Sequence, residues 1–149
     1  MRPKIRGEAA KCLGNLAIGD GEYFTQRNLE KFLDMVKVQK DAALNISIAD
    51  AIASTLCGYD VGEGPPTEDF SNNYCNDEAF EKFLNALIRL VPEPNTHARQ
   101  ASSVWLLAVV KHCSYRPAVM NQKQMLQYAF TELLSDDSGK CFKSLALKT

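Results

Sequence analysis

The sequence predicts an all-α protein whose helices stack in pairs as an α-solenoid, and two observations support this prediction. Apolar residues recur at the spacing of amphipathic helices in one segment after another. The period-2 alternation that would indicate strands does not persist in any segment. With 149 residues, 46% of them hydrophobic and 23% charged, the chain has the size and composition of one soluble globular domain.

The first predicted helical pair lies at the N-terminal end of the sequence. Its first helix covers about residues 5–16 and stops at the glycine-containing turn of residues 19–21. Ala9 and Ala10 are small enough to let a neighbouring helix approach closely. We expect Thr25 to cap the second helix. The apolar stripes of the two helices are Ile5, Ala9, Leu13 and Leu16, and then Leu29, Phe32, Leu33 and Val36.

A third helix is predicted from Ala42 to about Leu56, between the Lys40-Asp41 turn and Gly58. Its alanines again favour close approach of a neighbouring helix. We expect it to bury one apolar side: Leu44, Ile48, Ile52 and Leu56.

Residues 58–78 interrupt this helical rhythm and are predicted to form an acidic loop insertion, because turn-forming residues are frequent and no basic residue occurs. Three aromatic residues of this segment, Tyr59, Phe70 and Tyr74, could dock on a basic groove of a partner. A solvated insertion without a binding role is the stronger interpretation. The six acidic residues are Asp60, Glu63, Glu68, Asp69, Asp77 and Glu78.

Three further segments complete the predicted helices. A fourth helix ends at the proline-containing stretch of residues 91–95, and a fifth runs from about Thr96 to about His112. Pro117 is expected in the next turn, and a last helix closes near residues 136–139. The predicted apolar positions are Phe80, Phe83, Leu84, Leu87 and Leu90, then Ala101, Trp105, Leu106 and Val109, then Met125, Tyr128, Ala129, Phe130, Leu133 and Leu134.

The first, third and fifth helices can be laid over one another with offsets of 39 and 54 residues. Leu13, Ile52 and Leu106 then coincide, as do Arg6, Asn45 and Arg99. HEAT and armadillo units recur at about 40–47 residues, so the first offset is close to one unit. The second offset equals one unit plus the acidic insertion. We therefore predict about three HEAT-like helical pairs over residues 1–138, followed by a divergent C-terminal tail at 139–149.

The turn before the fifth helix also follows the HEAT pattern, in which a polar cap precedes a hydrophobe-arginine pair and a small residue. Here Asn95 is followed by Ala98, Arg99 and Ala101. Arg99 is expected to bridge to an acidic residue of a neighbouring repeat. Asn45 stands at the equivalent position of the middle unit, so the predicted arginine ladder is incomplete.

Neither end of the predicted array carries a polar capping repeat. The first helix begins near Met1 with apolar residues, and the tail contains Phe142, Leu145 and Leu147. Repeats of this kind cannot bury their apolar faces without neighbours. We therefore expect the chain to be a slice of a longer array and to self-associate through its uncapped ends.

Charge, hydropathy and cysteine content exclude several function classes. The formal net charge is −1, and no basic stripe suggests a nucleic-acid partner. The longest apolar run, residues 104–110, is far shorter than the ~20 residues of a membrane span. Five cysteines without a C-x-x-C pair favour reduced thiols in an intracellular protein over a disulfide framework: Cys12, Cys57, Cys75, Cys113 and Cys141.

No set of residues has the spacing of a catalytic, cofactor or metal site. The adjacent His112 and Cys113 point about 100° apart on a helix, which disfavours a nucleophile-base pair. His97 lies at the opposite end of the same helix from His112, too far to share a metal ion. The glycine-rich residues 58–64 lack the lysine of a phosphate-binding loop. Trp105 could be a binding hot spot, but its mid-helix position favours core packing.

Several strings resemble the very large HEAT-repeat proteasome adaptor and scaffold family, in that family's order and spacing, from about residue 6 to about residue 138. They are Lys11-Cys12-Leu13-Gly14 with Gly19-Asp20, Asn28-Leu29 through Leu33, Lys40-Asp41-Ala42-Ala43, Pro94-Asn95-Thr96-His97-Ala98-Arg99-Gln100-Ala101 and Val104-Trp105-Leu106-Leu107. Family members are many times longer than this chain, and the tail after Ser138 does not look like their next repeat.

The resemblance implies a non-enzymatic scaffold that binds the 26S proteasome and tethers its core particle to its regulatory particle. It also implies roles in proteasome assembly and quality control, and a location in the cytoplasm, in the nucleus and peripherally at endomembranes. The resemblance supplies no catalytic or cofactor-binding residue, and the residues that contact a partner stay unassigned. The alternative is a HEAT module of a transport or chromosome-organising protein.

Overall fold

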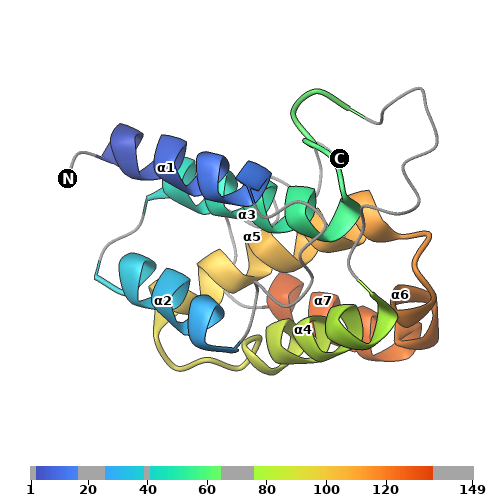
Figure 1. Ribbon diagram of the computed structural model, residues 1–149. Coiled ribbons are helices and arrows are strands. Elements are labelled where there is room, and N and C mark those ends of the chain that lie inside the picture. Colours follow the sequence, from blue (N-terminus) through green and yellow to red (C-terminus); the bar gives the residue numbers. More distant parts are fainter. Residues whose placement is uncertain (1–2, 17–25, 39–40, 65–75, 136–149) are drawn as a thin grey trace.

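The computed structural model describes residues 3–16, 26–38, 41–64 and 76–135 (Figure 1). These residues form helices and connecting turns, and no strand occurs among them, so the all-α prediction is confirmed. The helices are α1 (Pro3–Leu16), α2 (Gln26–Val36), α3 (Ala42–Cys57), α4 (Asp77–Arg89), α5 (Thr96–Cys113), α6 (Pro117–Asn121) and α7 (Lys123–Ser135).

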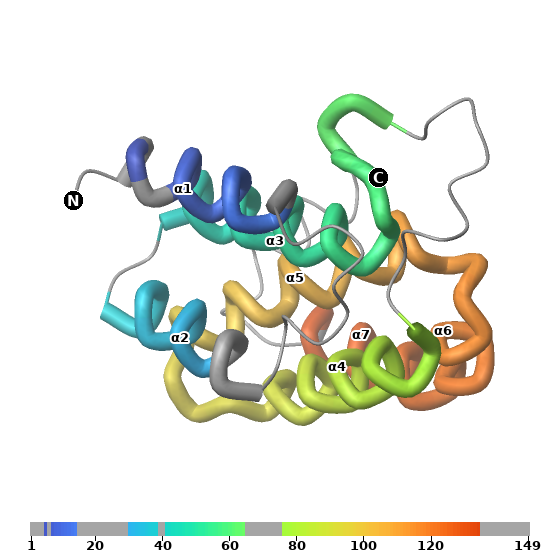
Figure 2. The backbone as a smooth tube through the Cα atoms, viewed as in Figure 1, coloured from blue at the N-terminus to red at the C-terminus, as the bar shows by residue number. Residues whose placement is uncertain are grey.

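The three helices related by the sequence offsets lie side by side. Helix α1 packs on α3, and α3 packs on α5, as the tube in Figure 2 shows. On the other side of this layer, α2 packs across α5 and α3, while α4 contacts α5, α6 and α7. Helix α3 therefore lies between two helices that occupy the same repeat position as itself.

Capping residues fix where the helices of this layer begin and end. The Asp41 carboxylate accepts a hydrogen bond from the Leu44 amide at 3.0 Å, and the Asn95 side chain accepts one from the Ala98 amide at the same distance. Gly58 ends α3 with a φ of 84°, a left-handed conformation that glycine adopts without a Cβ penalty. The predicted boundaries of α3 and α5 are therefore confirmed to within one residue.

The middle of the layer is fully buried. All four residues of the predicted α3 stripe, Leu44, Ile48, Ile52 and Leu56, are no more than 1% exposed. Trp105 of α5 is completely buried and meets Phe32 of α2 edge-on, with ring centroids 6.4 Å apart. Core packing is therefore confirmed for Trp105.

Helix α1 meets α3 through small residues. Gly14 lies so close to Ala51 that an added Cβ would come within 2.5 Å of the Ala51 Cα. The buried Thr55 hydroxyl of α3 donates to the Gly14 carbonyl at 3.2 Å. Ala10 is buried at this contact, whereas Ala9 is exposed. The expected close approach therefore exists, through Ala10 and Gly14 and without Ala9.

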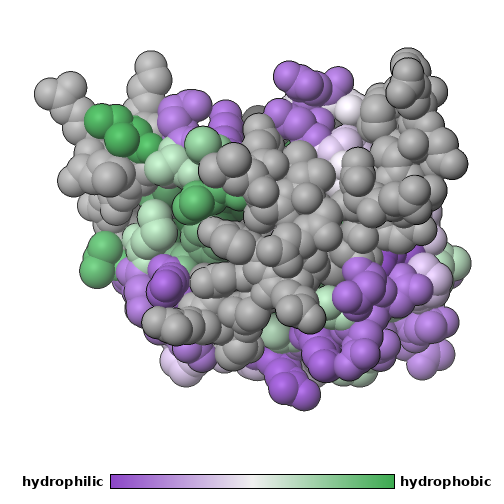
Figure 3. Space-filling view, viewed as in Figure 1, coloured by the Kyte–Doolittle hydropathy of each residue, from purple (hydrophilic) through white to green (hydrophobic). Residues whose placement is uncertain are grey.

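The apolar stripe predicted for α1 does not face this contact. Ile5 is 53% exposed and Leu13 is 43% exposed. Figure 3 shows apolar side chains gathered at the left of the face, over α1 and α3. The side chains of Leu16 and of Leu29, the first residue of the second predicted stripe, lie outside what the structure describes, as does the predicted cap Thr25. The rest of that stripe, Phe32, Leu33 and Val36, is buried.

The structure corrects the prediction at three places in the C-terminal half. Asp77 and Glu78 belong to the first turn of α4 and not to the acidic loop, because Asn76 caps that helix. Pro117 starts the short helix α6, since proline suits a first helical position where no amide donor is needed. In α7 the buried residues include Leu126, which the predicted stripe left out, whereas the predicted Met125, Tyr128 and Leu134 are exposed.

Arg99, the arginine of the predicted ladder, forms a local hydrogen bond. Arg99 Nη1 donates to the Glu93 carbonyl oxygen at 2.9 Å, which is a contact within the turn before its own helix. Asn45 is buried, and the side chain of Arg6 lies outside the described residues.

Candidate interaction surface

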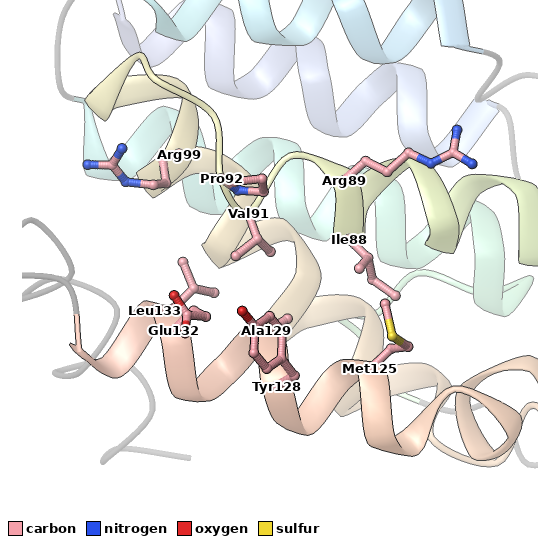
Figure 4. A pocket seen from close by; sticks show the side chains of 10 residues that line it. All are labelled: Ile88, Arg89, Val91, Pro92, Arg99, Met125, Tyr128, Ala129, Glu132 and Leu133. Carbon is pink, nitrogen blue, oxygen red and sulfur yellow. The ribbon is translucent and has the colours of Figure 1, made fainter.

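A groove of about 660 Å³ lies between α7 and the end of α4 with its following turn (Figure 4). Ile88, Val91 and Pro92 line it from one side. Met125, Ala129 and Leu133 line it from α7. The remaining lining residues are Arg89, Arg99, Tyr128 and Glu132.

The interior of this groove is mostly apolar, and its charged groups lie toward the edges. Figure 4 shows the guanidinium groups of Arg89 and Arg99 extending to opposite sides, away from the centre. Met125 and Tyr128 project from α7, and they are 55% and 65% exposed. An apolar channel with polar edges suits apolar side chains of a partner helix or peptide.

The two histidines of α5 lie at opposite ends of the helix, as the sequence predicts. His97 lies in the first turn of α5 and His112 in the last, so they cannot share a ligand. Burial is the main cause that lowers the pKa of His112, and the charge of Lys111 lowers it further. In the described part of the chain, no three His, Cys, Asp or Glu side chains are placed to hold a metal ion together.

The glycine-rich residues 58–64 form a turn that is hydrogen bonded to α3. The Val61 amide donates to the Ser54 hydroxyl at 3.1 Å, and the Gly62 amide donates to the Asp60 carboxylate at 2.9 Å. Tyr59 is half-buried against the core. Phe70 and Tyr74, the other aromatics of the proposed docking loop, lie outside the described residues.

The sequence does not predict one contact, which joins a cysteine of α3 to a cysteine of α5. The thiol of Cys113 lies 3.1 Å from the thiol of Cys57, a residue 56 positions earlier in the chain. The sequence carries no motif that pairs them, because the contact depends on how α3 packs against α5. His112 takes part only through its backbone carbonyl, which accepts from Cys57 at 3.5 Å.

The described residues thus define an all-α protein with a layer of register-related helices and an apolar groove beside it. Comparison with known proteins gives a more specific result. The chain is 69% identical, over 137 residues, to the proteasome-associated protein ECM29 homolog of Drosophila melanogaster. It is 27% identical, over 143 residues, to the human proteasome adapter and scaffold protein ECM29. The family resemblance seen in the sequence is thereby confirmed.

The matches cover nearly all of this chain but a small part of each relative. The fruit-fly alignment includes 92% of this chain and 7% of the relative, and the human alignment includes 90% and 8%. The chain therefore corresponds to one segment of much longer proteins.

Two other comparisons gave no match. No protein-family model and no solved structure matches the chain. Within the described residues, no helix has the length and apolar character required to cross a membrane.

Proposed function

We propose that this chain is a non-enzymatic scaffold segment of a HEAT-type solenoid that binds the 26S proteasome. The observation that carries the proposal is the 69% identity, over 92% of the chain, to a protein named as proteasome-associated. The side-by-side packing of α1, α3 and α5 at their repeat offsets supports the solenoid architecture.

In this proposal the segment helps to hold the core and regulatory particles together, and so contributes to proteasome assembly and quality control. A scaffold acts by presenting surface, and the groove beside α7 offers apolar surface that is accessible to a partner. An amphipathic helix of a proteasome subunit has the right chemistry for this groove. The chain would accordingly be found where proteasomes are, in the cytoplasm, in the nucleus and peripherally at endomembranes.

The test is a binding assay between the immobilised chain and purified proteasome particles. Intact 26S proteasomes, isolated core particles and isolated regulatory particles are offered separately. The proposal predicts that at least one particle is retained above a bead control. Absence of binding to all three particles would contradict a self-sufficient proteasome-binding segment.

A matched pair of variants then tests the groove. Tyr128→Glu adds a negative charge on a groove-lining residue, whereas Gln127→Glu adds the same charge on a neighbouring exposed residue that does not line the groove. We expect about tenfold weaker retention for the first variant, about 1.4 kcal/mol, and unchanged retention for the second. Equal retention of both variants would place the contact elsewhere on the chain.

A further inference from the structure

The C-terminal ends of α3 and α5 bring two thiols together in the core. Cys57 and Cys113 are both 0% exposed, and their sulfur atoms lie 3.1 Å apart. Cys57 donates to the His112 carbonyl oxygen, which leaves its sulfur able to accept from the Cys113 thiol. The pair joins two neighbouring helices of the repeat layer.

Two tyrosine hydroxyl groups act on Cys57 although it is buried. Those of Tyr59 and Tyr115 lower the pKa of its thiol. Tyr115 is 55% exposed, whereas both cysteines are fully buried. Structural buried cysteines are inert, whereas reactive cysteines lie in electropositive, partly exposed surroundings, so the reactivity of this pair depends on how close its two sulfurs lie.

An ion-paired arginine contributes to the electrostatics of the pair. Arg116 lies three residues after Cys113, the last residue of α5, and its side chain is only 3% exposed. It forms an ion pair with Asp77 at 2.8 Å and lies over the Phe80 ring, 4.5 Å from the centroid. The hydrogen bond with Cys113 lowers the pKa of the Cys57 thiol most, and Arg116 lowers it further, against the opposing effect of burial.

We propose that Cys57 and Cys113 form a redox-sensitive dithiol that hydrogen peroxide converts to a disulfide linking α3 to α5. A disulfide requires a sulfur-sulfur distance of about 2.05 Å, so the two sulfurs need to approach by about 1 Å. The two helices that carry the cysteines, α3 and α5, already pack side by side. The inference is independent of the proteasome proposal.

The reaction has two balanced steps. The Cys57 thiolate attacks one peroxide oxygen, the O–O bond breaks, and the departing hydroxide takes up the thiol proton as water. The sulfur of Cys113 then attacks the resulting sulfenic sulfur, the S–O bond breaks, and the second hydroxide leaves as water with the Cys113 proton. Peroxide is reduced to two water molecules, and two thiols are oxidised to one disulfide. A small dithiol reductant reverses the reaction by exchange.

The test uses the full chain with Cys12, Cys75 and Cys141 replaced by serine, so that only the proposed pair is left. After treatment with hydrogen peroxide, the protein is denatured, its thiols are alkylated with a maleimide, and the intact mass is measured. We expect both alkylation sites to be lost, a mass decrease of two hydrogen atoms, and full recovery of both sites with dithiothreitol. The same background with Cys57→Ser should gain oxygen on its one thiol and show no such mass decrease.

Oxygen addition to the pair without loss of two hydrogens would overturn the proposal, as would two thiols that persist under peroxide concentrations that oxidise glutathione. Peptide mapping of the oxidised wild-type chain provides the second measurement, in case the serine replacements disturb folding. A crosslinked peptide containing Cys57 and Cys113 is expected. Crosslinks of these residues exclusively to Cys12, Cys75 or Cys141 would also refute the pairing.

Discussion

Helices α1 and α3 occupy equivalent positions in the repeat, but the apolar stripe of α3 is buried and that of α1 is largely exposed. The stripe of α3, with Leu44 and Ile52, is buried, whereas the equivalent Ile5 and Leu13 of α1 are about half exposed. Both stripes have the same helical spacing over their first three positions in the sequence. Helix α3 has a register-related helix on each side, but α1 packs on only one in the described structure. Burial in a repeat array therefore depends on the neighbouring helices as well as on a helix's own pattern.

The largest predicted effect comes from truncating the same repeat position in the two helices. Ile52→Ala leaves a cavity in a fully buried site and should cost about 2–5 kcal/mol of unfolding free energy. Leu13→Ala removes a half-exposed side chain and should cost at most about 1 kcal/mol. Urea denaturation of both variants measures the difference. Equal losses would show that the two positions are equally buried in solution.

The second prediction concerns the small residues between α1 and α3. Gly14→Ala would force a Cβ to within 2.5 Å of the Ala51 backbone, and we expect a loss of about 1–3 kcal/mol. Gly7→Ala is the matched control, because its nearest contact, at 2.9 Å, is the Ser47 hydroxyl, which can rotate away. The same denaturation measurement ranks the two variants. A larger loss for Gly7→Ala would contradict the close approach at Gly14.

Some of this architecture follows from local sequence signals. Asp41, Asn95 and Gly58 mark helix ends through interactions within a few residues, so the bounds of α3 and α5 are predictable. The 39- and 54-residue offsets likewise anticipate which helices lie side by side. These features depend on properties that a single helix or turn already contains.

Other features depend on packing between elements and were missed. The spacing of Ile5 and Leu13 matches a buried stripe, but spacing alone does not identify which face of α1 meets α3. Helix α6 is too short to show a repeating apolar pattern. The sequence predicts a turn at Pro117 because proline also suits turns. Cys57 and Cys113 meet only because α3 and α5 pack together, and so no local pattern predicts that pair. The groove likewise combines two separate helices and a turn.

The third prediction uses the exposed face of α1 to test self-association. If the chain associates through this face, Leu13→Glu should weaken association at least about tenfold, or about 1.4 kcal/mol. Gln127→Glu, at an exposed position of α7, should leave association unchanged. Sedimentation velocity over a concentration series measures both. A wild-type chain that remains a clean monomer over the series would rule out this association.

The smallest predicted effect is a pH dependence from His112, at the half-buried end of α5. Burial and then Lys111 lower its pKa below the ordinary 6.5, while Asp50 opposes them. The unfolded chain therefore binds the proton first as the pH falls through about 6.5, so stability decreases on acidification. Thermal unfolding at several pH values should show a shallower slope for His112→Gln. An identical slope in the two proteins would contradict this role.

Asp50 affects stability in a different pH window and with the opposite sense. Burial is the main cause that raises its pKa above 3.8, so the folded state disfavours the ionised form. Its ionisation consequently reduces stability as the pH rises through that ordinary value. Measurements of the His112 effect are therefore best made well above this window.

The layer of register-related helices is an arrangement in which α3 is the enclosed member and α1 the edge. Amide hydrogen exchange of the monomeric chain tests it most directly, because exchange reports local stability helix by helix. We expect the central amides of α3 to exchange slowest, and those of α1 at least about tenfold faster. Protection of α1 equal to that of α3, in a chain shown to be monomeric, would contradict the proposed arrangement.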